Sequence, residues 1–301
     1  MKNKTYKVLA LKYRPSSFKN LIGQDIMVET ITNSIKLNKL PNAYLLSGIR
    51  GVGKTTTARL IARALNCNKD FLKEENCNCS HCEEIANSRH LDVVELDAAS
   101  RTGIDDIRTL IESSQYNPTS AKYKIYILDE AHQLSKSAWA GLLKTLEEPP
   151  TPSVKFIFAT TEIKKVPVTI ISRCQRFDLH RVSISELVKN LEKILDIEKG
   201  KVSKEALVLI AKAAEGSVRD SLSLLDRALI SENVYGGKID EKFVRKMLGL
   251  ADRTKILNLL NFIFQGDQKK SIDLVRELIN EGIQPSNFLN DFLEMIYFIQ
   301  R

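Results

Sequence analysis

The chain has 301 residues, of which 43% are hydrophobic, so it is long enough and apolar enough for two or three domains with buried cores. It contains no apolar run near the ~18 residues that a membrane-spanning helix needs, and residues 1–7 lack the apolar segment of a signal peptide, so we expect a cytoplasmic protein without membrane contact. The 45 lysine and arginine residues outnumber the 37 aspartate and glutamate residues, and the net charge of +8 suits either an anionic partner such as nucleic acid or a merely solvated basic surface.

The first segments lead up to a short buried strand. Residues 6–25, interrupted by Pro15, predict an extended lead-in. The spacing of Ile26, Ile31 and Ile35 then predicts an amphipathic helix over 25–37, which ends before Pro41.

The stretch 43–59 predicts a strand, a glycine-containing loop and the start of a helix. Gly48, Gly53, Lys54 and Thr55 match the pattern G-x-x-x-x-G-K-[ST], in which backbone N–H groups at a helix N-terminus surround phosphate oxygens. In such a site Lys54 reaches the β- and γ-phosphates and Thr55 binds Mg²⁺. The predicted nucleotide-binding residues of this stretch are Gly48, Gly51, Val52, Gly53, Lys54, Thr55 and Thr56.

Four of the five cysteines fall within residues 67–82: Cys67, Cys77, Cys79 and Cys82. Four thiolates complete a closed tetrahedral shell, which predicts a structural zinc site with no open position for catalysis. Cys79 and Cys82 form the usual C-x₂-C clip, whereas Cys77 is one residue too close to Cys79 and Cys67 stands alone. His81 is an alternative ligand, and reduced cysteines without a metal on a surface insertion remain the competing interpretation.

Strands and helices alternate through the next hundred residues. Strands are predicted at 92–97, 123–129, 154–159 and 175–179, and helices at 103–114 and 135–147. This alternation indicates a parallel sheet covered by helices on both faces, with ligands at the carboxyl ends of the strands. Asp129 and Glu130 end one strand, where Asp129 would hold the Mg²⁺ shell and Glu130 would polarise the attacking water. We interpret His132 as structural.

From residue 183 onward the pattern predicts helices only. They cover 184–195, 203–214, 217–230 and 240–248, and a further helical unit covers 254–264, 268–281 and 285–301. Apolar residues such as Phe292 and Phe298 still lack partners at the last residue, so we expect the chain to be part of a longer protein.

With both nucleotide motifs placed, the sequence resembles the gamma/tau subunits of the bacterial DNA polymerase III clamp loader, a family of AAA+ ATPases. The resemblance covers nearly the whole chain and rests on an ordered set of stretches: residues 13–15, 48–55, the four cysteines, 97–101, 128–132, 142–150, 159–161, 172–174 and 216–220.

The resemblance implies a P-loop AAA+ fold of the α/β class. Residues 1–180 would form the ATPase domain with the zinc-binding insertion at 67–82. Residues 181–240 would form an all-α lid of three helices, and residues 241–301 would begin a helical collar.

The resemblance also implies roles that spacing does not give. Thr161 would be sensor 1, Arg219 would be sensor 2 on the lid, and Arg14 would flank the adenine. Arg173, in Ser172-Arg173-Cys174, would be the arginine finger that reaches the nucleotide of a neighbouring subunit. Without the resemblance, Arg173 reads as a surface residue and Arg219 as a helix salt-bridge partner.

The family's cysteine run resembles C-x₂-C-x₂-C, and here Cys77 is shifted from it by one residue.

The function implied is that of an ATP-driven motor subunit that opens a sliding clamp and loads it onto primed DNA, without a polymerase site of its own. The cofactors implied are ATP, Mg²⁺ and structural Zn²⁺. The partners implied are other clamp-loader subunits, further copies of this chain, the clamp and primed-template DNA, bound without sequence preference. The alternatives are an AAA+ DNA helicase or remodelling motor of the Holliday-junction type, and a non-enzymatic scaffold that would have no need of Lys54 or Asp129.

Overall fold

The computed structural model describes residues 6–69, 71–73, 77, 79–100, 103–235, 237–250, 253–280 and 282–300. The chain divides into two compact units, Met1–Leu187 with Gly216–Asp220 and Val188–Glu215 with Ser221–Arg301. Among the described residues, no helix combines the length and the apolar character required to cross a membrane.

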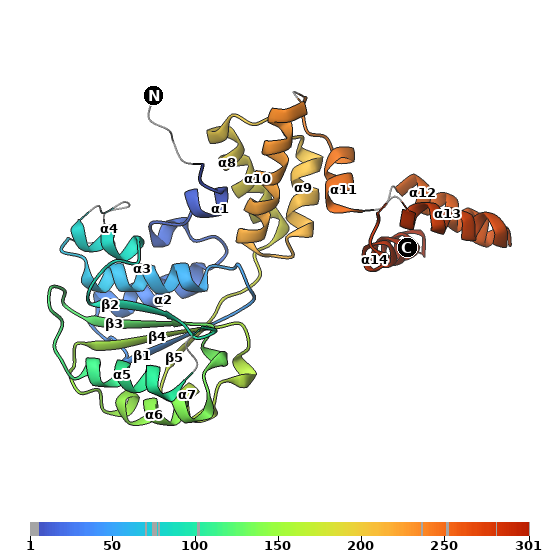
Figure 1. The fold of residues 1–301 in the computed structure, drawn as a ribbon. Coiled ribbons are helices and arrows are strands. Elements are labelled where there is room, and N and C mark those ends of the chain that lie inside the picture. Colours follow the sequence, from blue (N-terminus) through green and yellow to red (C-terminus); the bar gives the residue numbers. More distant parts are fainter. Residues whose placement is uncertain are drawn as a thin grey trace. The chain divides into compact units, whose positions relative to one another are not determined.

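The first unit is built on a five-stranded sheet in which every neighbouring pair is parallel (Figure 1). The strands are β1 (Ala43–Ser47), β2 (Val93–Asp97), β3 (Lys124–Asp129), β4 (Val154–Thr160) and β5 (Gln175–Asp178). Their order in the sheet is β2-β3-β4-β1-β5, so β4 lies between the strand that enters the glycine loop and the strand that ends in Asp129. The predicted parallel sheet is thus confirmed.

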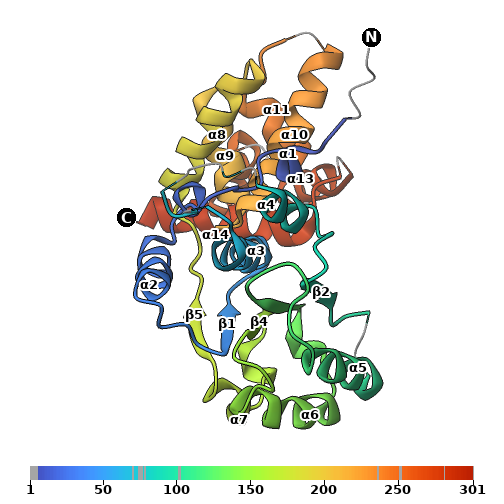
Figure 2. The same cartoon turned by 90° about the vertical axis from the view of Figure 1, so that its left-hand side faces the viewer.

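Helices cover both faces of this sheet (Figures 1 and 2). One face packs against α2 (Asp25–Lys36) and α3 (Lys54–Asn66), and the other packs against α5 (Ile104–Ser114), α6 (Lys136–Glu147) and α7 (Val168–Ile171). Successive strand residues point to opposite faces, so Ile125 and Ile127 belong to the first core while Tyr126 and Leu128 belong to the second. Burial on both faces explains why the strands read as continuous apolar runs in the sequence.

The lead-in is more structured than we predicted. Residues 6–25 contain a four-residue helix, α1 (Leu9–Lys12), and a 3₁₀ turn, η1 (Phe18–Asn20), where we expected an extended segment. Phe18 is buried, and its ring packs edge-on against the ring of Phe71, with the two ring centroids 5.9 Å apart. The helix α4 (Ser80–Ala86) and the turns η2 (Ala131–Gln133) and η3 (Ile163–Lys165) were also not predicted, because three to seven residues are too few to show a helical period.

The second unit is helical, as the sequence predicts. Its helices are α9 (Lys204–Ala213), α11 (Glu241–Leu248), α12 (Arg253–Phe264), α13 (Gln268–Asn280), α14 (Pro285–Gln300) and most of α8 (Ile184–Glu198) and α10 (Val218–Tyr235). Side-chain caps begin α9 and α11, for example, since Ser203 Oγ accepts a hydrogen bond from Ala206 N and Asp240 Oδ1 accepts one from Phe243 N. An isolated parallel bridge joins Val202 to Ile239, and α12 to α14 share a small core of Ile256, Leu260, Leu278 and Ile283.

Candidate nucleotide-binding site and cysteine cluster

The glycine loop between β1 and α3 closes around the side chain of Lys54. Gly53 enters α3 with φ +109°, a conformation that side chains disfavour, and a Cβ on Gly48 would lie 2.6 Å from the carbonyl oxygen of Leu179. Lys54 is 6% exposed, and its Nζ donates to the carbonyls of Gly48 and Ile49, both at 2.9 Å. Burial lowers the pKa of Lys54, and the nearby carboxylates act in the opposite direction. The loop therefore holds a cation at the N-terminus of a helix, where anions bind.

Thr55 and Asp129 meet at the carboxyl edge of the sheet. Thr55 Oγ1 donates to Asp129 Oδ2 at 2.5 Å, and the other carboxylate oxygen, Oδ1, accepts from the backbone N–H of Glu130 at 3.0 Å. A hydroxyl and a carboxylate at this separation are oxygen donors of the kind that Mg²⁺ prefers. The donor set therefore fits the predicted magnesium ion.

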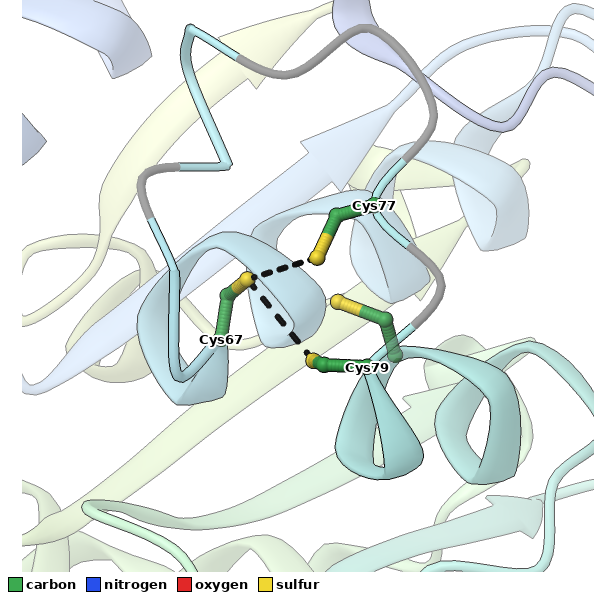
Figure 3. A group of neighbouring side chains, drawn as sticks. Cys67, Cys77 and Cys79 are labelled. Carbon is green, nitrogen blue, oxygen red and sulfur yellow. Dashed lines mark hydrogen bonds between the residues drawn. The ribbon is translucent and has the colours of Figure 1, made fainter.

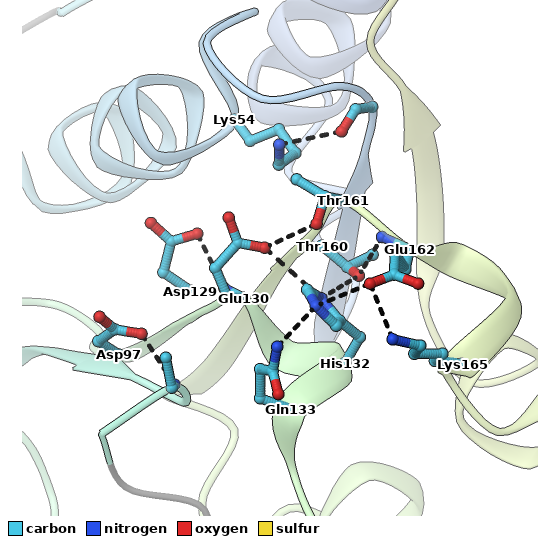
Figure 4. A network of polar contacts seen from close by, with 12 residues as sticks. Lys54, Asp97, Asp129, Glu130, His132, Gln133, Thr160, Thr161, Glu162 and Lys165 are labelled. Carbon is cyan, nitrogen blue, oxygen red and sulfur yellow. Dashed lines mark hydrogen bonds and ion pairs between the residues drawn. The ribbon is translucent and has the colours of Figure 1, made fainter.

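Glu130 belongs to a polar network with the residues that follow β4 (Figure 4). Its Oε2 accepts a hydrogen bond from Thr161 Oγ1 at 3.0 Å and lies 3.5 Å from His132 Nδ1. Its backbone is left-handed, with φ +47°. Strained backbone of this kind persists where surrounding contacts hold it, and here those contacts direct the carboxylate.

His132 connects Glu130 to two residues that the sequence analysis did not select. Its side chain is 5% exposed, with Nδ1 3.2 Å from Thr160 Oγ1 and Nε2 3.4 Å from Glu162 Oε1. Thr160 and Glu162 flank Thr161 at the carboxyl end of a strand, a position that is itself a signal for ligand contact.

Two further predicted residues, Arg14 and Arg219, lie beside the loop. Arg14 Nε donates to Thr56 Oγ1 at 3.1 Å, and the backbone N–H of Arg219 donates to Gly51 O at 3.2 Å. Burial lowers the pKa of Arg14, and the positive charges of Arg59 and Arg219 lower it further. This accumulation of positive charge favours an anionic ligand.

Arg59 is a member of this group that sequence reasoning missed. It lies one turn beyond Thr55 in α3 and forms a double hydrogen bond with Glu95 on β2, with Nε 2.8 Å from Oε2 and Nη2 2.7 Å from Oε1. Arg14 and Arg59 together line a pocket of about 190 Å³ on the side of α3. No spacing rule in the sequence links residue 59 to residue 95.

Arg173 makes its hydrogen bonds to residues outside the nucleotide site. Its Nε donates to Glu147 Oε1 at 2.7 Å and its Nη1 to the Thr169 carbonyl at 2.6 Å. The structure thus places it at the junction of α6 and α7, away from the hydrogen bonds around Lys54.

The four cysteines of residues 67–82 bring their sulfur atoms together, and Figure 3 labels three of them, Cys67, Cys77 and Cys79. All four Sγ atoms lie within 4.8 Å of one another, with Cys67 at 3.3 Å from Cys77 and at 3.8 Å from Cys79. A tetrahedral zinc with Zn–S bonds of about 2.3 Å needs sulfur atoms about 3.8 Å apart. The set fits zinc, and it includes Cys77 despite its irregular spacing.

The environment of the sulfurs suits a shared cation. Burial raises the pKa of Cys67 to about 11 and also raises that of Cys82. Burial would raise the pKa of Cys79 as well, but the backbone N–H groups of Asn68 and Cys82 hold it at about 7. Neutral thiols in such a cluster become good ligands once a metal replaces their protons.

Arg63 of α3 lies buried against this cluster. Its Nη2 donates to the Cys77 carbonyl at 3.1 Å and its Nη1 to the Ser16 carbonyl at 2.7 Å, while the guanidinium stacks 5.1 Å from the Phe71 ring. A buried guanidinium here would offset part of the negative charge of four thiolates.

His81 lies in a separate group with Glu84 and His90. His90 Nδ1 accepts the backbone N–H of Asp92 at 3.0 Å, so in the neutral ring the proton is on Nε2, which donates to His81 Nδ1 at 2.7 Å. Burial lowers the pKa of His90, which favours this neutral form. His81 Nδ1 is therefore engaged with His90, and the residue groups with Glu84 and His90 rather than with the four cysteines.

Among solved structures, the chain is similar to the RuvB Holliday junction branch migration motor of Thermotoga maritima. The TM-score is 0.61 at 18% sequence identity, covering 95% of this chain and 91% of that one. A second structure, of a point mutant of the same protein, gives a TM-score of 0.59 with the same coverage. At this identity the similarity shows the AAA+ fold alone.

Three sequence models of protein families match successive parts of the chain. Residues 23–183 match "DNA polymerase III, delta subunit", residues 186–233 match "DNA polymerase III clamp loader subunit, ATPase lid domain", and residues 239–301 match "DNA polymerase III subunits gamma and tau domain III". All three describe parts of one replication assembly.

Curated relatives agree with these matches. DNA polymerase III subunit tau of Escherichia coli is 40% identical over 98% of this chain and 45% of its own length, so the chain spans about half of that relative. DNA polymerase III subunit gamma of Buchnera aphidicola subsp. Schizaphis graminum is 40% identical over 98% of this chain and 80% of its own length. These matches, together with the fold and the site, show that the chain belongs to the gamma/tau family of DNA polymerase III clamp-loader subunits.

Proposed function

We propose that this chain is an ATP-hydrolysing motor subunit of a clamp loader, and that ATP binds at the loop between β1 and α3. The observation that carries the proposal is the hydrogen bond from Thr55 Oγ1 to Asp129 Oδ2, which unites the phosphate loop with the acidic end of β3. A scaffold subunit would have no use for this arrangement.

In the proposed site, the backbone of Gly48, Gly51, Val52 and Gly53 surrounds the phosphates. On ATP binding, Lys54 Nζ gives up its hydrogen bonds to the carbonyls of Gly48 and Ile49 and donates to the β- and γ-phosphates instead. Thr56 contacts the phosphates, with the guanidinium of Arg14 beside it. Arg219, whose backbone N–H donates to Gly51 O, adds positive charge beside the loop.

The proposed hydrolytic step depends on Glu130. Its carboxylate accepts a hydrogen bond from the attacking water and thereby orients it toward the γ-phosphate, while Thr161 holds the carboxylate in place. Mg²⁺, held by Thr55 and Asp129, would supply neutralisation of phosphate charge. In our proposal, Arg173 adds a guanidinium to the site of the neighbouring subunit.

We further propose that Cys67, Cys77, Cys79 and Cys82 hold a structural zinc ion. The sulfur distances and the buried Arg63 support this. Because four thiolates fill a tetrahedral shell, the ion would have no open position and would stabilise the segment after α3.

We also propose the domain division 1–180, 181–240 and 241–301, which the separate family matches over 186–233 and 239–301 support. The partners proposed are other loader subunits, further copies of this chain, the sliding clamp and primed DNA. Contacts to DNA phosphates rather than bases would make that binding salt-sensitive and independent of sequence.

The test is ATP turnover by the full-length protein assembled with its partner subunits. We expect strong stimulation that requires both the clamp and primed DNA, and that is lost in Lys54→Ala. Stimulation by DNA alone, with the clamp having no effect, would refute the clamp-loader proposal in favour of a translocating motor.

A further inference from the structure

Arg173 is held in its own subunit by a carboxylate from a different helix. Glu147 is the last residue of α6, and its Oε1 accepts from both Nε, at 2.7 Å, and Nη2 of Arg173. The Nη1 group donates to the Thr169 carbonyl of α7 at 2.6 Å and lies 3.4 Å from Ser172 Oγ. All three guanidinium nitrogens are therefore engaged.

Hydrogen bonds and core packing anchor the backbone of Arg173 and Cys174. Arg173 N donates to Ile170 O at 3.0 Å and Cys174 N donates to Ile171 O at 3.2 Å. Ile170 is fully buried, and Cys174 packs against the same core just before β5. With the backbone anchored, the direction of the long arginine side chain depends on the groups that bind its tip.

The guanidinium keeps donor capacity for a further ligand. It has five N–H groups, and the four hydrogen bonds described above use at most four of them. At least one N–H on Nη2 is left for an incoming anion. The side chain of Arg173 is 32% exposed, so an anion can reach it from solvent or from a neighbouring molecule.

We propose that Glu147 is the positioning residue of Arg173, holding the guanidinium in the orientation in which it meets the nucleotide of the adjacent subunit. This inference rests on the proposed function, because it takes Arg173 to be an arginine finger that acts in trans. Glu147 itself does not touch the nucleotide and acts only through Arg173. It remains bonded to the guanidinium during turnover, while the unused N–H meets the phosphate.

If the Glu147–Arg173 pair were purely structural, removing Glu147 would have little effect on stability or turnover. Glu147 is 51% exposed, and ion pairs between exposed side chains contribute little to stability. Positioning of a catalytic group, by contrast, has large kinetic consequences, since a displacement of about 1 Å can reduce the rate about a hundredfold. Loss of Glu147 should therefore appear in turnover and not in unfolding.

The experiment measures steady-state ATP hydrolysis by the assembled full-length loader with clamp and primed DNA. Glu147→Ala should lower kcat about tenfold or more, and the KM for ATP should stay within about twofold because Glu147 does not touch the nucleotide. Glu148→Ala is the matched control: it removes the adjacent exposed glutamate of the same helix end and should leave kcat unchanged. Both variants should unfold at the temperature of the wild type.

A double mutant separates positioning from other effects. In an Arg173→Ala background, which should already be severely impaired, adding Glu147→Ala should cause no further loss. An additive loss there, or a kcat in Glu147→Ala that is unchanged or raised, would overturn the inference while leaving a severe Arg173→Ala defect, and hence the proposed function, intact. If Arg173→Ala alone has no effect, the finger assignment fails, and the role of Glu147 fails with it.

Discussion

The hydrogen bond from Thr161 to Glu130 gives a quantitative test of the proposed hydrolytic site. Replacing Thr161 with Val keeps the branched shape of the side chain but removes the hydroxyl that donates to Glu130 Oε2 at 3.0 Å. Hydrogen bonds to charged groups contribute about 1.5–3 kcal/mol. The Glu130 side chain is 33% exposed, so water compensates in part and we expect about 1–2 kcal/mol.

If this energy is used to hold Glu130 in position for the attacking water, Thr161→Val should slow hydrolysis about 5- to 30-fold. The assay is single-turnover ATP hydrolysis by the assembled loader with clamp and primed DNA, with ATP affinity measured separately and expected to stay within about twofold. Thr161→Ser, which keeps the hydroxyl, is the control. A Val variant within twofold of the wild type, or a Ser variant as slow as Val, would refute the reasoning.

Three other predictions concern the metal, the subunit interface and acid stability. The purified protein should contain one zinc per chain, and Cys79→Ser should lose it and melt at a lower temperature. Cys174→Ser, outside the cluster, should keep its zinc; equal zinc in all three proteins would contradict the proposed site. Loaders that mix Lys54→Ala chains with Arg173→Ala chains should recover turnover beyond that of either single mutant, whereas no recovery would argue against action in trans. Burial opposes ionisation of Asp92, but three backbone N–H groups of the loop before β3 outweigh it and lower its pKa from 3.8. Its stabilising contribution should therefore be complete above about pH 3.8 and be lost as the pH falls through the lower folded-state pKa. Urea unfolding at several pH values should show a shallower acid decline in Asp92→Asn, and an identical decline would contradict this.

The parts of the site that could be predicted from the sequence are short contiguous motifs. Lys54 and Thr55 follow an apolar strand, and Asp129 ends another, so each motif carries its own structural context. The all-parallel sheet followed from the same alternation of elements. Local patterns were sufficient to place these residues because each one lies at or soon after the carboxyl end of a strand. The carboxyl ends of parallel strands meet at one edge of the sheet, so the strand pattern also predicts that these residues lie near one another.

Contacts that depend on the path of the chain were not predictable. Glu147 and Arg173 are 26 residues apart and Arg59 and Glu95 are 36 apart, and no periodicity links either pair. The sulfur of Cys77 joins the cluster although Cys77 lies only two residues before Cys79, a spacing that the usual C-x₂-C zinc clip does not describe. The short helix α1 was missed because four residues carry no helical period.

The position of β1 in the sheet has a consequence for how the protein is made. Its five residues are all buried, and its two neighbours are the last strands of the sheet to be synthesised. Ser47 at the end of β1 and Asp178 at the end of β5 are hydrogen-bonded although they are 131 residues apart. At about 5–20 residues per second, a ribosome needs about 7–26 s to make that stretch. For most of this interval, until β4 has been made, the apolar strand that leads into the phosphate loop has no neighbouring strand to pair with, and its second neighbour, β5, follows last. We therefore expect the nascent chain to depend on chaperones during this time.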